Sequence, residues 1–303
     1  MAILGSGDIE LPKNIAAGLW QRAQTGSTVS VLSGAEPMQF GEVSFMTFTT
    51  PPRAEYVGEG AQKSSSEVGF GVKVAQPRKV QVTLRFNQEV LWADEDYQLG
   101  VLTTCANAAG DALSRALDFG VYHAVNPLTG GNVASITEKV TDTTNTVELS
   151  GTAANADLEF EAAAGLIIAD EFVPNGVALD PKFAWTLSTA RYEDGRKKYP
   201  DLGLGTNVTA FEGLQASTSS TVSGMPEAAD TNVRAIMGDF TQLRWGVQRN
   251  VPVRQIPYGD PDGQGDLQGQ NQIALRTEVV YGWAIMDLNA FALLNNAPAG
   301  GEG

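Results

Sequence analysis

Few residues of this sequence could carry out chemistry. Its 303 residues include one histidine, His123, and one cysteine, Cys105. A lone cysteine excludes an intrachain disulfide and a cysteine-based zinc site, and a lone histidine excludes a multi-histidine metal centre. The G-x-S-x-G, H-E-x-x-H and P-loop motifs are absent from the sequence. We therefore expect Cys105 to be a buried inert thiol on a helix face, and His123 to have a surface or capping role.

Two charged clusters also invite a chemical interpretation. The stretch "DPDGQGD" (260–266) resembles a calcium loop, through Asp260, Asp262 and Asp266. It lacks the later glutamate that an EF-hand requires, so a polar glycine-rich loop is the preferred interpretation. A small basic cluster, Arg191 and 196–198, suits a solvated helix end better than a nucleic-acid site. The sequence thus predicts no metal site and no cofactor site.

The stretch "GEGAQKSSSE" (58–67) stands between two strand patterns and carries Lys63. It is too long and too rich in serine for a tight hairpin, and it lacks phosphate-loop spacing. The residues before and after it favour strands, with Val68, Phe70, Val72 and Val74 alternating with other residues. We therefore expect a long, flexible, lysine-bearing loop at the tip of a two-stranded hairpin.

The elements that position these residues follow from periodicity. After "QPRK", a second alternating run over 80–87 predicts a strand, and helical spacing over about 93–122 predicts a helix of roughly 40 Å. The final strand, from 271, is expected to pair with the 80–90 strand beside that helix. Further predictions are a short helix opened by Pro12, a helix within 155–172, a strand at "NGVALD", strands within 232–250, and a helix with Asp180 as N-cap, Pro181 as first residue and Gly195 as stop.

Composition limits the class of protein. The net charge is 20 − 35 = −15, which argues against binding nucleic acid through its phosphates. Only 18% of residues are charged, which suggests that much of the surface is covered. The first residues lack a basic segment followed by an apolar one, and the longest apolar run (162–169) is too short to span a bilayer. We expect a soluble cytoplasmic product with two lobes.

The order of these features resembles the major capsid protein of tailed double-stranded DNA bacteriophages, with the Hong Kong 97 phage-type fold. The resemblance rests on "GEGA-x-K", "NGVALDP" and the final "N-x-I-x-L-R-x-E", and covers about 9–296. It implies an α+β fold with an N-terminal arm (1–52), an extended loop (53–79), a peripheral domain with a long spine helix (80–128 and 272–296), a mixed α/β axial domain (129–271) and a flexible tail (297–303).

The resemblance also implies a function. Copies of the chain would form hexamers and pentamers that close into an icosahedral shell around viral DNA, without sequence-specific DNA binding and without a membrane. The implied partners are further copies of the chain, a separate scaffolding protein, a portal and a decoration protein. Assembly would take place in the host cytoplasm, and the mature location would be the virion capsid.

In the family's type member, a loop lysine forms an isopeptide bond with an asparagine of a neighbouring subunit, assisted by a glutamate. The matching positions here are Lys63, Asn271 and Glu278, the last two at the family's spacing. Assembly would bring the groups together. Plainer readings remain open: Lys63 forms only a salt bridge to a neighbour, Asn271 is a turn residue, and Glu278 pairs with an arginine such as Arg276 or Arg85.

Three other functions compete with a viral shell. One keeps the fold but makes the chain an encapsulin-like nanocompartment shell that holds an enzyme cargo. Another is an unrelated soluble α/β enzyme that uses Asp and Glu residues, which a compact monomer with a carboxylate-lined pocket would support. The third is a phage tail or decoration protein, against which the long helix and the discontinuous lobes argue.

Overall fold

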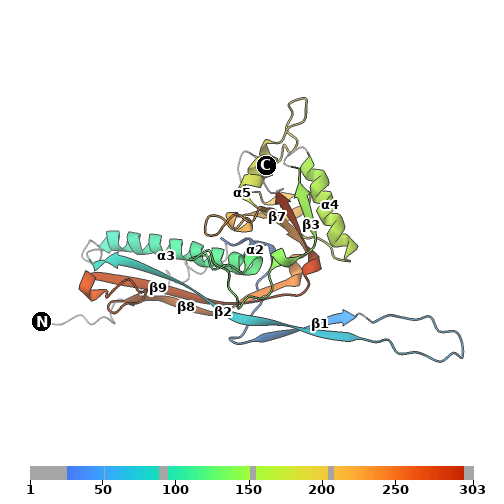
Figure 1. Ribbon diagram of the computed structural model, residues 1–303, viewed down its shortest axis with the longest axis horizontal. Helices are drawn as coiled ribbons and strands as arrows, with labels where there is room; N and C mark the ends of the chain where they lie inside the picture. Colours follow the sequence, from blue (N-terminus) through green and yellow to red (C-terminus); the bar gives the residue numbers. More distant parts are fainter. Residues whose placement is uncertain (1–25, 51, 89–94, 151–154, 204–207, 297–303) are drawn as a thin grey trace, which may run out of the picture.

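The computed structural model describes residues 26–50, 52–88, 95–150, 155–203 and 208–296. Figure 1 shows an L-shaped molecule: a long body of one helix on a sheet, an upright body at one end, and a hairpin that projects from their junction. The helix predicted from Pro12 lies outside the described residues. The described chain begins before a short helix, α2 (Thr28–Leu32), capped by Ser27.

The long body is built on a four-stranded antiparallel sheet in the order β1-β2-β9-β8. Its strands are β1 (Val43–Thr50), β2 (Gly69–Asn87), β8 (Leu243–Ile256) and β9 (Gln272–Ile285). The predicted pairing of the final strand with the 80–90 strand is confirmed, because β9 pairs with 76–87 of β2. The two alternating runs on either side of "QPRK" form one continuous strand. Pro77 lies inside β2, just past the residues that pair with β1, where one side of the strand needs no partner.

The predicted long helix is present as α3 (Glu95–Asp118), which continues into a π-helical turn (Phe119–His123). Val80 and Val82 of β2 pack against the core that contains Leu113 and Leu117 of α3. Tyr281 of β9 donates a hydrogen bond to the Leu113 carbonyl, 3.2 Å away. Helix α3, the predicted spine helix, therefore lies along one face of the sheet (Figure 1).

The upright body holds a mixed six-stranded sheet in the order β3-β10-β7-β4-β6-β5. Its strands are β3 (Thr146–Leu149), β4 (Gly176–Leu179), β5 (Ala210–Phe211), β6 (Leu214–Thr218), β7 (Val233–Gly238) and β10 (Phe291–Asn296). Two helices, α4 (Ala156–Ala169) and α5 (Pro181–Thr189), share one core with the sheet, and residues at the end of α3 share the other. Short 3-10 turns lie at Val140–Asp142, Ser220–Val222, Phe240–Gln242 and Leu288–Ala290, and another, Gln268–Gln270, precedes β9 in the long body.

Helix α5 confirms one end of its prediction and corrects the other. The Asp180 carboxylate accepts a hydrogen bond from the Lys182 N–H at 2.8 Å, and Pro181 is the first helical residue. The helix ends at Thr189 rather than at Gly195. Ala190 turns to extended backbone, and Arg191 then forms an isolated bridge with Lys197, so Gly195 serves a turn beyond the helix instead.

Sheet membership does not follow the domain limits implied by the resemblance. Strand β8 falls within 129–271 but pairs with β9 in the long body. Strand β10 falls within 272–296 but pairs with β3 and β7 in the upright body. The chain thus crosses between the two bodies more often than those limits allow.

Candidate functional site

The lysine-bearing loop closes the β1–β2 hairpin at the end farthest from the sheet (Figure 1). Lys63 is exposed, as are its neighbours in the loop. A turn precedes it, in which the Ala61 N–H donates to the Gly58 carbonyl at 3.1 Å and Gly60 adopts a φ of +79°. In a single copy of the chain, the Lys63 ammonium therefore faces solvent.

The serines that follow Lys63 tie the two sides of this loop together. The Ser64 N–H donates to the Glu55 carboxylate at 2.7 Å, and the Ser64 hydroxyl donates to its other oxygen. These bonds lower the pKa of Glu55. The Arg53 N–H donates to the Ser66 hydroxyl at 2.8 Å. Sequence reasoning missed this role, because no local pattern pairs a glutamate with a serine nine residues later.

Asn271 lies where the chain enters β9. Its φ of 54° is left-handed, a conformation that asparagine tolerates better than most residues. Its N–H donates to the Gln268 carbonyl at 3.2 Å, and its own carbonyl accepts from the Gln88 N–H at 2.9 Å. Asn271 is thus an exposed turn residue. The left-handed turn alone accounts for an asparagine at this position, and it leaves the carboxamide accessible at the surface.

Glu278 forms an ion pair, but not with the arginines considered from the sequence. Its Oε2 lies 2.8 Å from Nζ of Lys79, on the adjacent strand β2, and its side chain is 17% exposed. Arg276 instead donates to the Thr83 hydroxyl at 3.0 Å and to the Pro261 carbonyl at 2.6 Å. For Glu278 to accept a proton from another lysine, Lys79 would have to share or release it.

One copy of the chain does not bring the three residues together. Asn271 and Glu278 are separated by seven residues of nearly extended chain, about 23 Å at 3.3 Å per residue. The hairpin that carries Lys63 projects away from the end of the long body where β9 begins (Figure 1). Any reaction among these residues must therefore combine different copies.

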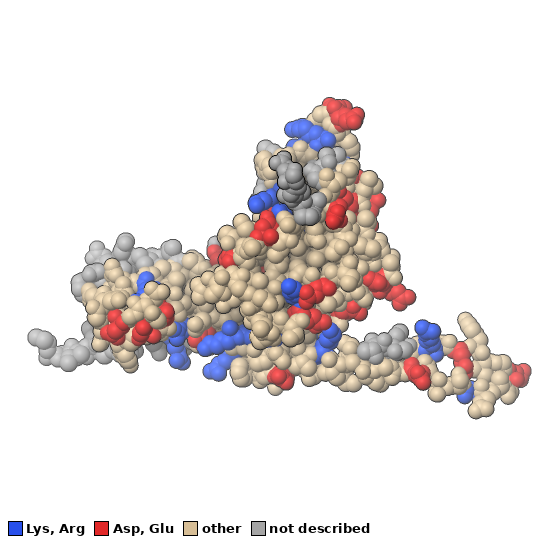
Figure 2. Space-filling model, in the orientation of Figure 1, with Lys and Arg blue, Asp and Glu red and all other residues tan. Residues whose placement is uncertain are grey.

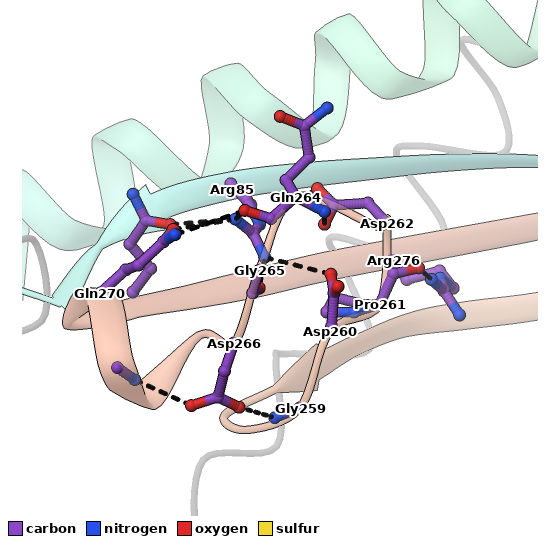
Figure 3. Close-up of polar contacts among 12 residues, drawn as sticks. Arg85, Gly259, Asp260, Pro261, Asp262, Gln264, Gly265, Asp266, Gln270 and Arg276 are labelled. Atoms are coloured by element: carbon purple, nitrogen blue, oxygen red, sulfur yellow. Dashed lines mark hydrogen bonds and ion pairs between the residues drawn. The ribbon is translucent and has the colours of Figure 1, made fainter.

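The stretch that resembles a calcium loop is organised by an arginine (Figure 3). Arg85 of β2 lies 3.1 Å from the Asp262 carboxylate and 3.7 Å from that of Asp260, and it donates to the Gln264 and Gly265 carbonyls. Asp266 accepts from the backbone N–H groups at 259 and 269. The acids are therefore satisfied within the fold. Across the described residues, no group of three or more His, Cys, Asp or Glu side chains could hold a metal ion.

His123 is buried, so the surface alternative of the predicted surface or capping role is wrong. It ends the π-helical turn after α3, and its Nε2 lies 2.9 Å and 3.1 Å from the carbonyl oxygens of Thr221 and Val222. Burial is the main cause that lowers the pKa of His123. Cys105 is half-buried rather than buried, and desolvation raises the pKa of its thiol, which disfavours the reactive thiolate.

Sequence reasoning missed a buried carboxylate, Asp118, at the end of α3. It accepts hydrogen bonds from Ser27 and Thr28 hydroxyls, from the Thr28 and Val29 N–H groups, and from the Thr221 hydroxyl at 2.7 Å. Five donors from two distant segments replace the water that a buried carboxylate loses. Asp118 thus fixes the start of α2 and the 219–222 segment to the spine helix.

Comparisons with known proteins address the family. The chain matches the phage capsid family over residues 7–296. It is 22% identical to the probable major capsid protein gp17 of Mycobacterium phage D29 over 258 residues, which make up 82% of this chain and 78% of that protein. A solved structure from Mycobacterium phage Ogopogo is 50% identical with a TM-score of 0.82, covering 89% of this chain and 92% of that one.

A second solved structure, from Gordonia phage Cozz, is 33% identical with a TM-score of 0.78, covering 90% of this chain and 87% of that one. None of the helices in the described part of the chain is long and apolar enough to cross a membrane. The spine helix on its sheet, the upright α/β body and the long hairpin agree with these matches, which extend over nearly the whole chain. The chain therefore belongs to the phage capsid family and is a structural protein of the virion shell, with the Hong Kong 97-type fold.

Proposed function

We propose that this chain is a major capsid protein that assembles as hexamers and pentamers into an icosahedral shell around double-stranded viral DNA. The family match over residues 7–296 carries the proposal. Relatives from phages favour a viral shell over a compartment with an enzyme cargo. An acidic wall, with a net charge of −15, would repel packaged DNA rather than bind it.

The hairpin supports assembly with further copies of the chain. Met46 of β1 lies opposite Val72 of β2, so the two side chains share a face. Met46 is 73% exposed, Val72 59% and Phe70 61%. Contiguous exposed apolar side chains on a projecting hairpin are typical of a surface that another protein covers.

The finer arrangement is part of the same proposal. A separate scaffolding protein, a portal and a decoration protein would complete the particle, which would assemble in the host cytoplasm. The arm (1–52) and the extended loop (53–79) would contact neighbours. We propose that β8 belongs functionally with the peripheral domain and β10 with the axial domain, since each strand pairs within that body.

We further propose that Lys63 crosslinks to Asn271 of another copy. The neutral Lys63 amine would attack Cγ of Asn271, a carbon–nitrogen bond would form, and ammonia would leave. A Glu278 carboxylate, supplied by a copy other than the one providing that Asn271, would accept the proton from the attacking amine and return it to the leaving group. The separation of these residues in one chain explains why the reaction would await assembly.

Electron microscopy and a boiled, reducing denaturing gel of the same particles test these proposals separately. Closed shells support the capsid function, and a ladder at multiples of the 32.1 kDa chain supports the crosslink. Lys63→Ala should abolish the ladder. Lys63→Arg is the matched control, because it keeps the cation for a salt bridge but has no nucleophilic amine. A ladder that survives in Lys63→Arg would rule out Lys63 as the nucleophile.

A further inference from the structure

Helix α4 has an apolar surface that the described residues of the chain do not cover. Phe160, Ala163 and Ile167 pack onto the six-stranded sheet. On the outward side, Leu158 is 63% exposed and Ile168 59%, and Ala162 and Gly165 lie between them. The second half of α4, residues 162–169, is apolar around its whole circumference, which is typical of a helix segment that is covered on all sides. Within the described part of the chain, only one side of this segment is covered.

Gly165 gives an independent indication of a neighbour. It lies in the interior of α4, where glycine costs about 1 kcal/mol relative to alanine. Its φ is not positive, and a Cβ atom built on it would meet no described residue within 4 Å. The packing among the described residues therefore does not require a glycine here. A glycine on an exposed helix face lets the backbone of a second molecule approach closely.

The charges beside this face exclude pairing of α4 with the same helix of another copy. Residues 143–173 contain no lysine or arginine and six acids, Glu148, Asp157, Glu159, Glu161, Asp170 and Glu171. Lys198 pairs with one of them, Asp157, at 2.7 Å, which leaves five acids on this flank. Asp and Glu side chains mark this flank in Figure 2. Pairing two such flanks across a two-fold axis would place acid against acid, at a substantial cost. The partner surface must therefore be a different part of the second copy.

The opposite flank of the upright body has the complementary character. Helix α5 and the turn after it expose Trp185 (48%) and Tyr192 (53%), next to the cations Lys182 and Arg191. Exposed aromatic side chains beside arginine are typical of interface centres. Helices α4 and α5 share one core, in which Phe160 and Phe183 stack, and Figure 1 shows α4 along the right side of the upright body and α5 along the left. A head-to-tail contact between these flanks repeats from copy to copy, and it closes into a ring when the rotation permits.

We propose that the outward face of α4 packs against the α5 flank of a second copy of this chain, as the contact that closes the capsomer ring. The proposal rests on the proposed function, since it assigns the ring contact to particular residues. Leu158, Gly165 and Ile168 form one half of the contact. Trp185, Arg191 and Tyr192 form the other.

Two complementary variants test the contact. The first, Leu158→Glu with Ile168→Glu, blocks the α4 face; the second, Trp185→Glu with Arg191→Glu, blocks the α5 flank. Because these side chains are exposed in the single chain, both variants should fold, which circular dichroism and thermal melting check. Native mass spectrometry should show each variant as a monomer at concentrations where the wild type forms rings, and an equimolar mixture as a one-to-one heterodimer. Gly165→Trp should raise the concentration needed for assembly at least about tenfold, and Gly165→Ala, which adds only a Cβ atom, should raise it by less.

The outcomes separate the two proposals. If the first variant forms the same rings as the wild type, the α4 contact is overturned and the proposed capsid function is unaffected. Dimers of the second variant alone, through its intact α4 face, overturn the head-to-tail arrangement. A wild-type protein that stays monomeric under every assembly condition overturns the proposed capsid function, and the ring contact with it.

Discussion

At the scale of single residues, the buried Asp118 carboxylate has the largest predicted effect. An Asp118→Asn change leaves one acceptor oxygen for five donors and directs an amide N–H₂ toward groups that also donate. We expect the free energy of unfolding, measured in urea, to fall by about 2–4 kcal/mol, and amide hydrogen exchange at residues 27–29 to become faster. Asp201→Asn, at an exposed position, is the control. Equal effects of the two changes would contradict a special role for Asp118.

His123 predicts a pH dependence. Burial lowers its pKa in the folded state below the unfolded value of about 6.5, so the unfolded state binds more protons in that window. Stability from a neutral buried His123 is therefore complete above about pH 6.5 and falls as the pH drops below it. Melting temperatures measured between pH 5 and 7 should show a steeper loss for the wild type than for His123→Gln, whose amide can donate to the same carbonyls. Parallel curves would assign the acid sensitivity to other groups.

At the scale of elements, Arg85 holds the 259–270 loop against β2 through a planar set of donors. Lysine offers the same charge without that geometry. Arg85→Lys should therefore cost about 1–3 kcal/mol of stability and loosen the loop that leads into Asn271, seen as faster proteolysis or hydrogen exchange at 259–270. Arg254→Lys, at an exposed position of β8, is the matched change and should have little effect.

Elements with a strong local signal were predictable from the sequence. The alternation at Val80 and Val82 and the Asp180-Pro181 cap each act within a few residues, and the structure contains both elements. The parallel pairing of β3 with β10 was not predictable, because it joins residues some 150 positions apart that share no local pattern. The same holds for the candidate site. The family resemblance pointed to Lys63 and Glu278, but only the fold shows that Glu278 is already paired with Lys79.

At the scale of the whole molecule, the exposed hairpin face separates stability from assembly. Val72 is 59% exposed in the single chain, so Val72→Glu should change its free energy of unfolding by about 0.5 kcal/mol or less. In a shell, the same glutamate would be buried without a charged or hydrogen-bonding partner, which would raise the free energy of the assembled state. Electron microscopy should therefore show loss of particles while the melting temperature is preserved. Val72→Thr, which carries no charge, should retain assembly.

Strand β2 has a mechanical consequence. The same strand runs from the base of the exposed loop to the sheet beneath the spine helix, where residues 76–87 pair with β9. A pull on the hairpin tip acts along the strand axis, so the β2–β9 hydrogen bonds are loaded together in shear and do not open one at a time. The loop would thus act as a tether anchored in the centre of the sheet, able to carry tension from a neighbour when a filled container pushes outward.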